Sequence, residues 1–144
     1  MRRLVVLALG VPLVAGCGWF GGWAPYPGSS THTAQAVAVA PAAERVRHWV
    51  KVEHLRSKAL PGAKLFATAG CTACHTYAGA GSSNLGAPDL TAIGSRHLGI
   101  GFEIRHLRCP SCVNPGSPMP MFRSLGPKRL RELAVFLEAS KGTH

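Results

Sequence analysis

The run Cys71-Thr72-Ala73-Cys74-His75 decides how this chain folds and what it binds. Two thiols three positions apart lie on one helical turn, so both can bond to the two vinyl groups of a single haem. The histidine that follows then faces the iron as an axial ligand. The run therefore predicts one covalently attached haem c, held by Cys71 and Cys74, with His75 on the iron.

Other interpretations of the two cysteines stay open at this point. A thioredoxin-like redox pair would need a βαβ pattern around it, and the sequence shows none. A zinc site could join the pair to Cys109-Pro110-Ser111-Cys112, but 34 residues separate Cys74 from Cys109. Usual zinc ribbons have roughly 15–20 residues there. A structural disulfide is the third alternative.

The segments around the motif carry a family resemblance. From about residue 61 to 141 the chain resembles a class I c-type cytochrome, on the strength of Gly62-Ala63-Lys64-Leu65-Phe66, Gly86-Ala87-Pro88-Asp89-Leu90 and Gly94-Ser95-Arg96. The resemblance implies a small all-α fold of three to five helices wrapped around one covalently attached haem. It also implies that the Pro88 carbonyl accepts the Nδ1–H of His75, and that Arg96 helps to bind a haem propionate.

The resemblance places the second axial ligand in a Gly/Pro-rich loop, residues 114–122. Family members carry their ligand methionine in a Met-Pro step, and Met119 stands in such a step, 44 residues after His75. Met121 competes because it lies two positions further on. A pair of histidine ligands using His97 or His106 is a weaker alternative, since neither stands in a loop of this kind. Methionine ligation raises the reduction potential, as suits an electron carrier.

Two helices are expected to frame the domain. Pro61 suits the first position of a helix, where its missing N–H costs nothing. The last helix is predicted from Gly126-Pro127 to Gly142, with an apolar stripe at i, i+3, i+4 and i+7: Leu130, Leu133, Ala134 and Leu137. By resemblance these helices cross, with Gly62, Phe66 and Phe136 at the crossing.

The N-terminus has the pattern of an export signal. Arg2 and Arg3 precede an apolar run of 12 residues (4–15), which is too short to span a bilayer that needs about 20. The run ends in Leu13-Val14-Ala15-Gly16-Cys17, which resembles a bacterial lipobox. Residues 1–16 are therefore expected to be a lipoprotein signal peptide and Cys17 the lipidated residue. An ordinary secretory signal with a chance cysteine is the alternative. The protein is expected to be exported and lipid-anchored to the outer face of the cytoplasmic membrane.

The rest of the chain divides into three parts. Residues 17–43 are rich in Gly and Pro and are expected to form a flexible tether. Residues 44–58 predict a basic amphipathic helix with Val46, Trp49, Val50 and Leu55 on one side. Residues 59–144 form the expected cytochrome domain.

The chain is strongly basic and has an odd number of cysteines. The 144 residues carry 16 Lys+Arg against 6 Asp+Glu, a net charge of +10. Of the five cysteines, one is assigned to lipid and two to haem. Cys109 and Cys112 remain, and a disulfide between them is expected in an oxidising compartment. Free thiols are the alternative, and a second attached haem is not expected because Val113 replaces the histidine.

These features predict a membrane-tethered, single-haem protein that carries single electrons between respiratory partners and is not an enzyme. The expected partners are redox proteins with acidic docking surfaces, such as a terminal oxidase or a quinol-oxidising complex. The alternative is a fixed haem relay subunit of a larger respiratory or sulfur-oxidising complex. A haem sensor or peroxidase would need an open iron position, against which Met119 argues. Nucleic acid is not an expected partner, since no recognition motif is present.

Overall fold

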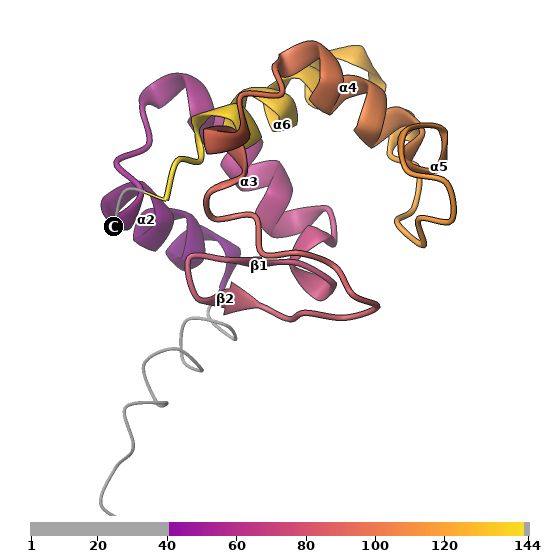
Figure 1. Ribbon diagram of the computed structural model, residues 1–144. Helices are drawn as coiled ribbons and strands as arrows, with labels where there is room; N and C mark the ends of the chain where they lie inside the picture. Colours follow the sequence, from indigo (N-terminus) through magenta and orange to yellow (C-terminus); the bar gives the residue numbers. More distant parts are fainter. Residues whose placement is uncertain (1–40, 143–144) are drawn as a thin grey trace, which may run out of the picture.

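Two helices cross at the centre of the structure, α3 (Leu60–Thr68) and α6 (Gly126–Ala139) (Figure 1). The computed structural model describes residues 41–142. At the crossing, Gly62 of α3 lies directly against the main-chain carbonyl of Glu132 and the side chain of Phe136 on α6. A Cβ at position 62 would lie 2.6 Å from the Phe136 Cβ, so only glycine allows this approach. The crossing that the sequence predicted is therefore present.

The helix before the domain differs from the expected one. Helix α2 spans Ala42–Val52, so it begins two residues before the expected start and ends well before residue 58. Glu53 follows it and His54 turns the chain with a positive φ of 49°. A short 3-10 helix, η1 (Ser57–Ala59), then leads into α3. The expected single helix over 44–58 was wrong, because the chain has to reverse at His54 to bring α2 alongside α3.

Helix α2 belongs to the core of the domain. Its Trp49 is fully buried, and the ring lies 5.8 Å from Phe66, 5.1 Å from Tyr77 and 6.3 Å from Phe136, between centroids. These four rings come from α2, α3, the segment after the haem motif, and α6. The packed domain therefore includes α2, and it does not begin at residue 59 as the sequence predicted.

The remaining elements surround this core. After α3 come η2 (Cys71–Ala73), a two-stranded antiparallel hairpin of β1 (Thr76–Tyr77) and β2 (Ala80–Gly81), and η3 (Ile93–Arg96). Helix α4 (Ile100–Arg108), the short α5 (Pro110–Val113) and η4 (Arg123–Leu125) then lead to α6. In Figure 1, α2 and α5 lie at opposite sides of the molecule.

The last described residues, 140–142, pack against the residue that follows α2 and against the haem-motif segment. Helix α6 ends at Ala139 rather than at Gly142, and Gly142 donates its N–H to the buried carboxylate of Glu53 at 3.0 Å. The Ser140 hydroxyl, also buried, pairs with the Tyr77 hydroxyl at 2.8 Å. These contacts hold the last turn of the chain against both α2 and the haem-motif segment.

The fold is a small all-α cytochrome c fold, as the sequence predicted, apart from the short hairpin. In the described range, 41–142, no helix is both long and apolar enough to cross a membrane. The expected signal peptide, the lipidated Cys17 and all but the end of the expected tether lie outside the described residues.

Candidate haem site

The cysteine motif folds into one tight turn at the end of α3. Gly70, with φ of 88°, reverses the chain, and η2 begins at Cys71. The main-chain N–H of His75 then donates to the Cys71 carbonyl at 2.9 Å. This hydrogen bond closes a single helical turn, which is the geometry needed to present two thiols and a histidine to one flat macrocycle.

Residues 81–84 hold this turn from the other side. Asn84 donates from its Nδ2 to the Ala73 carbonyl at 2.7 Å and from its main-chain N–H to the Cys74 carbonyl at 3.1 Å. The Ser82 hydroxyl donates to the same Ala73 carbonyl at 2.7 Å. Gly81, with φ of 95°, lies so close to the His75 carbonyl that a side chain would not fit. The turn is thus held through its own main-chain carbonyls, by hydrogen bonds from residues outside the motif.

Cys71 and Cys74 are not joined in a disulfide, and the two side chains differ in environment. Cys71 is buried at 8% exposure, whereas Cys74 is half-buried. Burial raises the pKa of the Cys71 thiol to about 11, against a smaller lowering by a backbone hydrogen bond and a further rise from Cys74. Cys71 is therefore a neutral thiol at neutral pH, the form whose S–H adds across a vinyl group.

The His75 ring is oriented by one hydrogen bond. Its Nδ1 lies 2.9 Å from the Pro88 carbonyl oxygen. A carbonyl can only accept, so Nδ1 carries the proton and Nε2 keeps the lone pair with which a metal is bound. The bond also increases electron donation from the imidazole.

The Pro88 carbonyl is held in place by its neighbours. The Asp89 carboxylate accepts from the Thr76 hydroxyl at 2.7 Å and from the Thr91 N–H at 2.7 Å. The Leu90 N–H donates to the Thr76 carbonyl at 3.0 Å. The loop that carries Pro88 is therefore fastened to β1, the strand that directly follows His75.

The loop that carries Met119 is fastened to α4. The Phe122 N–H donates to the Leu107 carbonyl at 2.9 Å. The neighbouring residue His106 has a pKa lowered by burial and then by the nearby charge of His75, so this turn of α4 lies close to the haem motif. Met119 is half-buried against the core, whereas Met121 is 50% exposed.

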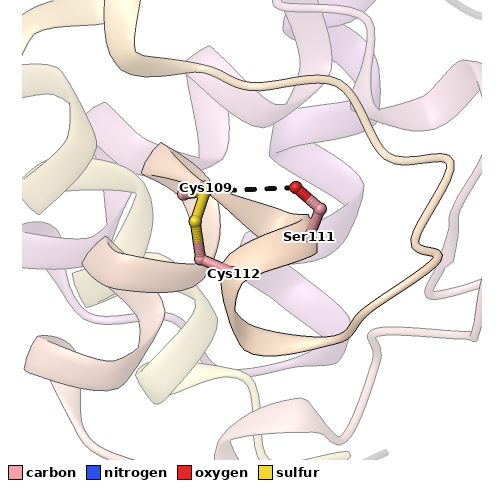
Figure 2. Close-up of a disulfide and its surroundings, with 3 residues drawn as sticks. All are labelled: Cys109, Ser111 and Cys112. Carbon is pink, nitrogen blue, oxygen red and sulfur yellow. Dashed lines mark hydrogen bonds between the residues drawn. A yellow bond between two sulfur atoms is a disulfide. The ribbon is translucent and has the colours of Figure 1, made fainter.

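The remaining sequence candidates occupy separate positions. Arg96 ends η3 with its side chain exposed. It is near the buried Glu103, whose carboxyl has a pKa raised by burial and by Glu138 and lowered by Arg96. His97 is exposed, with a positive φ of 53°. Cys109 and Cys112 form a disulfide (Figure 2).

The residues present fit a covalently held haem. The thiol pair of Cys71 and Cys74 could attach a haem, and the Nε2 of His75 and a methionine thioether are groups that could bind its iron. Apolar side chains left half-buried along 90–125 supply a surface for a flat apolar macrocycle: Leu90, Ile93, Met119, Phe122 and Leu125. Within the described residues, no group of three or more His, Cys, Asp or Glu could hold a bare metal ion instead.

Sequence reasoning missed Ser82, Asn84 and Gly81. All three act on main-chain carbonyls of the motif, and a main-chain partner leaves no trace in residue type. The positive φ of Gly81 is the one local feature a glycine could have signalled. Trp49 was placed on a helix face but not in the domain core.

Comparison with known proteins agrees with this geometry. The family model "Cytochrome c" matches residues 59–107, about a third of the chain. The match begins before α3 and ends at Leu107, before the Met119 loop and α6. No curated protein and no solved structure matches the chain significantly.

The described residues therefore contain a cytochrome c domain, and its cofactor is one covalently bound haem c. The match over residues 59–107 supports an electron-transfer haem protein.

Proposed function

We propose that this chain is a class I cytochrome tethered to a membrane by lipid on Cys17, which passes single electrons between respiratory protein partners. The observation that carries the proposal is the hydrogen bond from His75 Nδ1 to the Pro88 carbonyl, 2.9 Å long. It presents the Nε2 lone pair within one helical turn of Cys71 and Cys74. Bound there through Cys71 and Cys74, the haem supplies a one-electron couple between ferrous and ferric iron.

Met119 is the residue we assign to the second axial position. Its loop is fixed to α4 through the bond between Phe122 and Leu107, and its side chain lies against the core. The Met119 N–H also donates to the Ser117 hydroxyl at 3.3 Å. Met121 is half exposed to solvent, and a weak thioether ligand gains from a preorganised position rather than an exposed one.

This assignment has a direct test. Met119→Ala should abolish the weak long-wavelength band of methionine-ligated ferric haem and open the iron to carbon monoxide, whereas Met121→Ala should leave both unchanged. The reverse pattern would transfer the ligand to Met121. Carbon monoxide binding by the unaltered protein would favour a sensor or peroxidase instead.

Arg96 is the residue we assign to a haem propionate. Its guanidinium lies at the end of η3 near the carboxyl of Glu103, so the same charge already acts on a carboxylate in this region. Arg96→Gln should lower the reduction potential. The negative charge of a propionate disfavours reduction of the iron, and the variant removes the cation that offsets this charge. An unchanged potential would contradict the assignment.

The surface charge supports acidic partners. Nearly all Lys and Arg side chains of the described residues are exposed, whereas the acidic residues Glu53 and Glu103 are buried. Exposed Arg105, Arg108 and Arg123 lie on the elements that flank the Met119 loop. We infer that these arginines guide an acidic oxidase or quinol-oxidising complex toward the haem edge.

The experiment measures electron transfer from the reduced holoprotein to a solubilised terminal oxidase as a function of ionic strength. The double variant R105E/R108E should slow the reaction about tenfold or more at low salt. The matched control R47E changes an equally exposed arginine on α2, on the far side of the molecule (Figure 1), and should have little effect. Rates that ignore ionic strength, or equal losses in both variants, would contradict the docking surface.

The tether and the role as a mobile carrier have their own tests. Lipid on Cys17 predicts that C17A is released from the membrane fraction and that the intact mass of the unaltered protein includes acyl chains and one haem. Stable co-purification with large subunits in mild detergent would favour a fixed relay subunit over a carrier.

A further inference from the structure

The disulfide between Cys109 and Cys112 lies at the junction between α4 and the loop that carries Met119. Cys109 directly follows α4, and the four-residue helix α5 begins at Pro110. The two Cα atoms are 5.2 Å apart and only three positions separate the residues. Figure 2 shows the bond crossing the turn, with the long loop leaving beyond Cys112.

The two sulfur-bearing residues differ in access. Cys112 is exposed, whereas Cys109 is half-buried and Pro110 beside it is buried. Thiol–disulfide exchange requires an attacking thiolate to approach one sulfur in line with the bond, so access decides which sulfur is attacked. The incoming thiolate meets Cys112 Sγ, and Cys109 Sγ is the leaving group.

The surroundings favour departure of Cys109 as a thiolate. The Ser111 hydroxyl lies 4.0 Å from Cys109 Sγ and can donate to it (Figure 2). The exposed Arg108 directly precedes Cys109 at the end of α4. Neighbouring cations and donors stabilise a thiolate, and a better leaving thiolate speeds exchange.

The disulfide adds little to the stability of the whole domain. Because it closes a ring of only four residues, it removes less entropy from the unfolded chain than a long-range disulfide would. Its constraint is local. The Asn114 N–H donates to the Pro110 carbonyl at 2.8 Å, and the Cys112 N–H donates to the Cys109 carbonyl at 3.1 Å. The disulfide therefore holds the start of the loop, and the hydrogen bond from Phe122 to Leu107 holds its end.

We propose that Cys109–Cys112 is a thiol–disulfide exchange site that accepts electrons from a dithiol protein and, by opening, loosens the loop that carries Met119. This goes beyond one-electron transfer, because the site takes two electrons and needs a different class of partner. Only its effect on iron ligation rests on the proposed role of Met119.

The exchange balances in two steps. One thiolate of the dithiol partner attacks Cys112 Sγ, a mixed disulfide forms, the bond between Cys109 and Cys112 breaks, and Cys109 Sγ leaves as a thiolate that takes up a proton. The second thiol of the partner, as thiolate, attacks the partner's own sulfur in the mixed disulfide and releases Cys112 Sγ, which is also protonated. The partner ends as a disulfide, and the protein gains two electrons and two protons.

The test uses the oxidised, membrane-extracted holoprotein and dithiothreitol as the probe dithiol. In this protein the thiols of Cys71 and Cys74 are in thioether bonds, so new alkylatable thiols report on Cys109 and Cys112. After treatment at neutral pH without denaturant, mass spectrometry should find two added alkyl groups, both on the peptide that spans residues 109–112. Absence of labelling until the domain unfolds would overturn the proposal.

Two variants test the chemistry. R108Q should slow reduction several-fold, whereas R47Q on α2 should leave the rate unchanged. S111A should also slow it, since the hydroxyl no longer stabilises the departing Cys109 thiolate. Equal reduction rates in the unaltered protein, R108Q and S111A would overturn the conclusion that Arg108 and Ser111 stabilise the departing thiolate.

A second readout follows the loop without relying on iron ligation. Reduction should speed amide hydrogen exchange at least several-fold at Asn114 and Phe122, and not in α3 or α6. The double variant C109S/C112S should show the same fast exchange without reductant. Unchanged exchange in both would overturn control of the loop. Loosened amides with an unchanged ferric spectrum would place the failure in the Met119 assignment and leave the exchange site standing.

Discussion

Replacing Trp49 by alanine tests whether α2 is part of the cytochrome domain or a separate extension. Trp49 is fully buried, and its ring contacts Phe66, Tyr77 and Phe136 at centroid distances of 5.1–6.3 Å. The variant therefore removes the contact that joins α2 to three parts of the core at once.

The expected loss of stability follows from that burial. Truncation of a buried tryptophan to alanine costs about 3–5 kcal/mol, including the cavity that it leaves. One term opposes this. The Trp49 Nε1–H is buried and has no hydrogen-bond partner among the described residues, a cost to the native state that the variant relieves. We therefore expect a net loss of about 3 kcal/mol.

Urea unfolding of the oxidised holoprotein measures this loss. The haem stays attached to the unfolded chain through its thioether bonds, so the transition is unimolecular and independent of protein concentration. With a slope of about 1.5 kcal/mol/M, a loss of about 3 kcal/mol lowers the urea midpoint by about 2 M. Circular dichroism and the haem absorption band should report the same midpoint.

Two control variants separate the contribution of the ring from other effects. W49F keeps an aromatic ring and removes the unpaired N–H, so it should cost about 1 kcal/mol or less. R47A changes an exposed residue of the same helix and should stay within about 0.5 kcal/mol. A loss below about 1 kcal/mol in W49A, or a loss in R47A as large as in W49A, would refute the conclusion that α2 belongs to the core.

Three further changes test the crossing, a buried carboxyl and the cofactor. G62A should lower the free energy of unfolding in urea by about 3 kcal/mol, because its Cβ meets α6 at the crossing. The control G101A lies on an exposed turn of α4, with its nearest neighbouring atom 3.8 Å away, and should be neutral or stabilising. Similar losses in both variants would refute the crossing. Burial raises the pKa of Glu103 above 4.5, so the folded protein holds that proton more tightly and stability falls as the pH rises above that value. E103Q should flatten this slope and raise the free energy of unfolding at neutral pH, and an unchanged slope in pH-dependent urea titrations would contradict it. C71A/C74A should leave the chain largely unfolded, because so small a domain buries too little apolar surface alone; a native-like far-UV spectrum would show the opposite.

Local patterns in the chain predicted the parts of the structure that depend on local chemistry. The apolar stripe of the last helix and Pro61 at the first turn of α3 are present, and so is the close approach at Gly62 that the family resemblance implied. The stripe and the position of Pro61 depend only on residues close together along one helix, so residue types alone can predict them. The end of α6 was overestimated by three residues, because Ser140 turns inward to pair with Tyr77.

The contacts that position the haem motif were beyond local patterns. Asn84 and Ser82 bind main-chain carbonyls of the motif, and any polar residue at those positions would have looked the same. The raised pKa of Glu103 likewise depends on burial first, and then on the charges of Glu138 and Arg96, which come from other elements of the chain.

By itself the sequence determined the attachment turn, the histidine that follows it and the helices that frame the domain, because bonding patterns and helical period are set by residues close together in the chain. The family resemblance already pointed to Met119 and to the Pro88 carbonyl, but only the tertiary structure decided that α2 completes the core and that Ser82 and Asn84 hold the attachment turn. Those outcomes depend on which distant surfaces meet and exclude water, and that free energy is absent from any single segment.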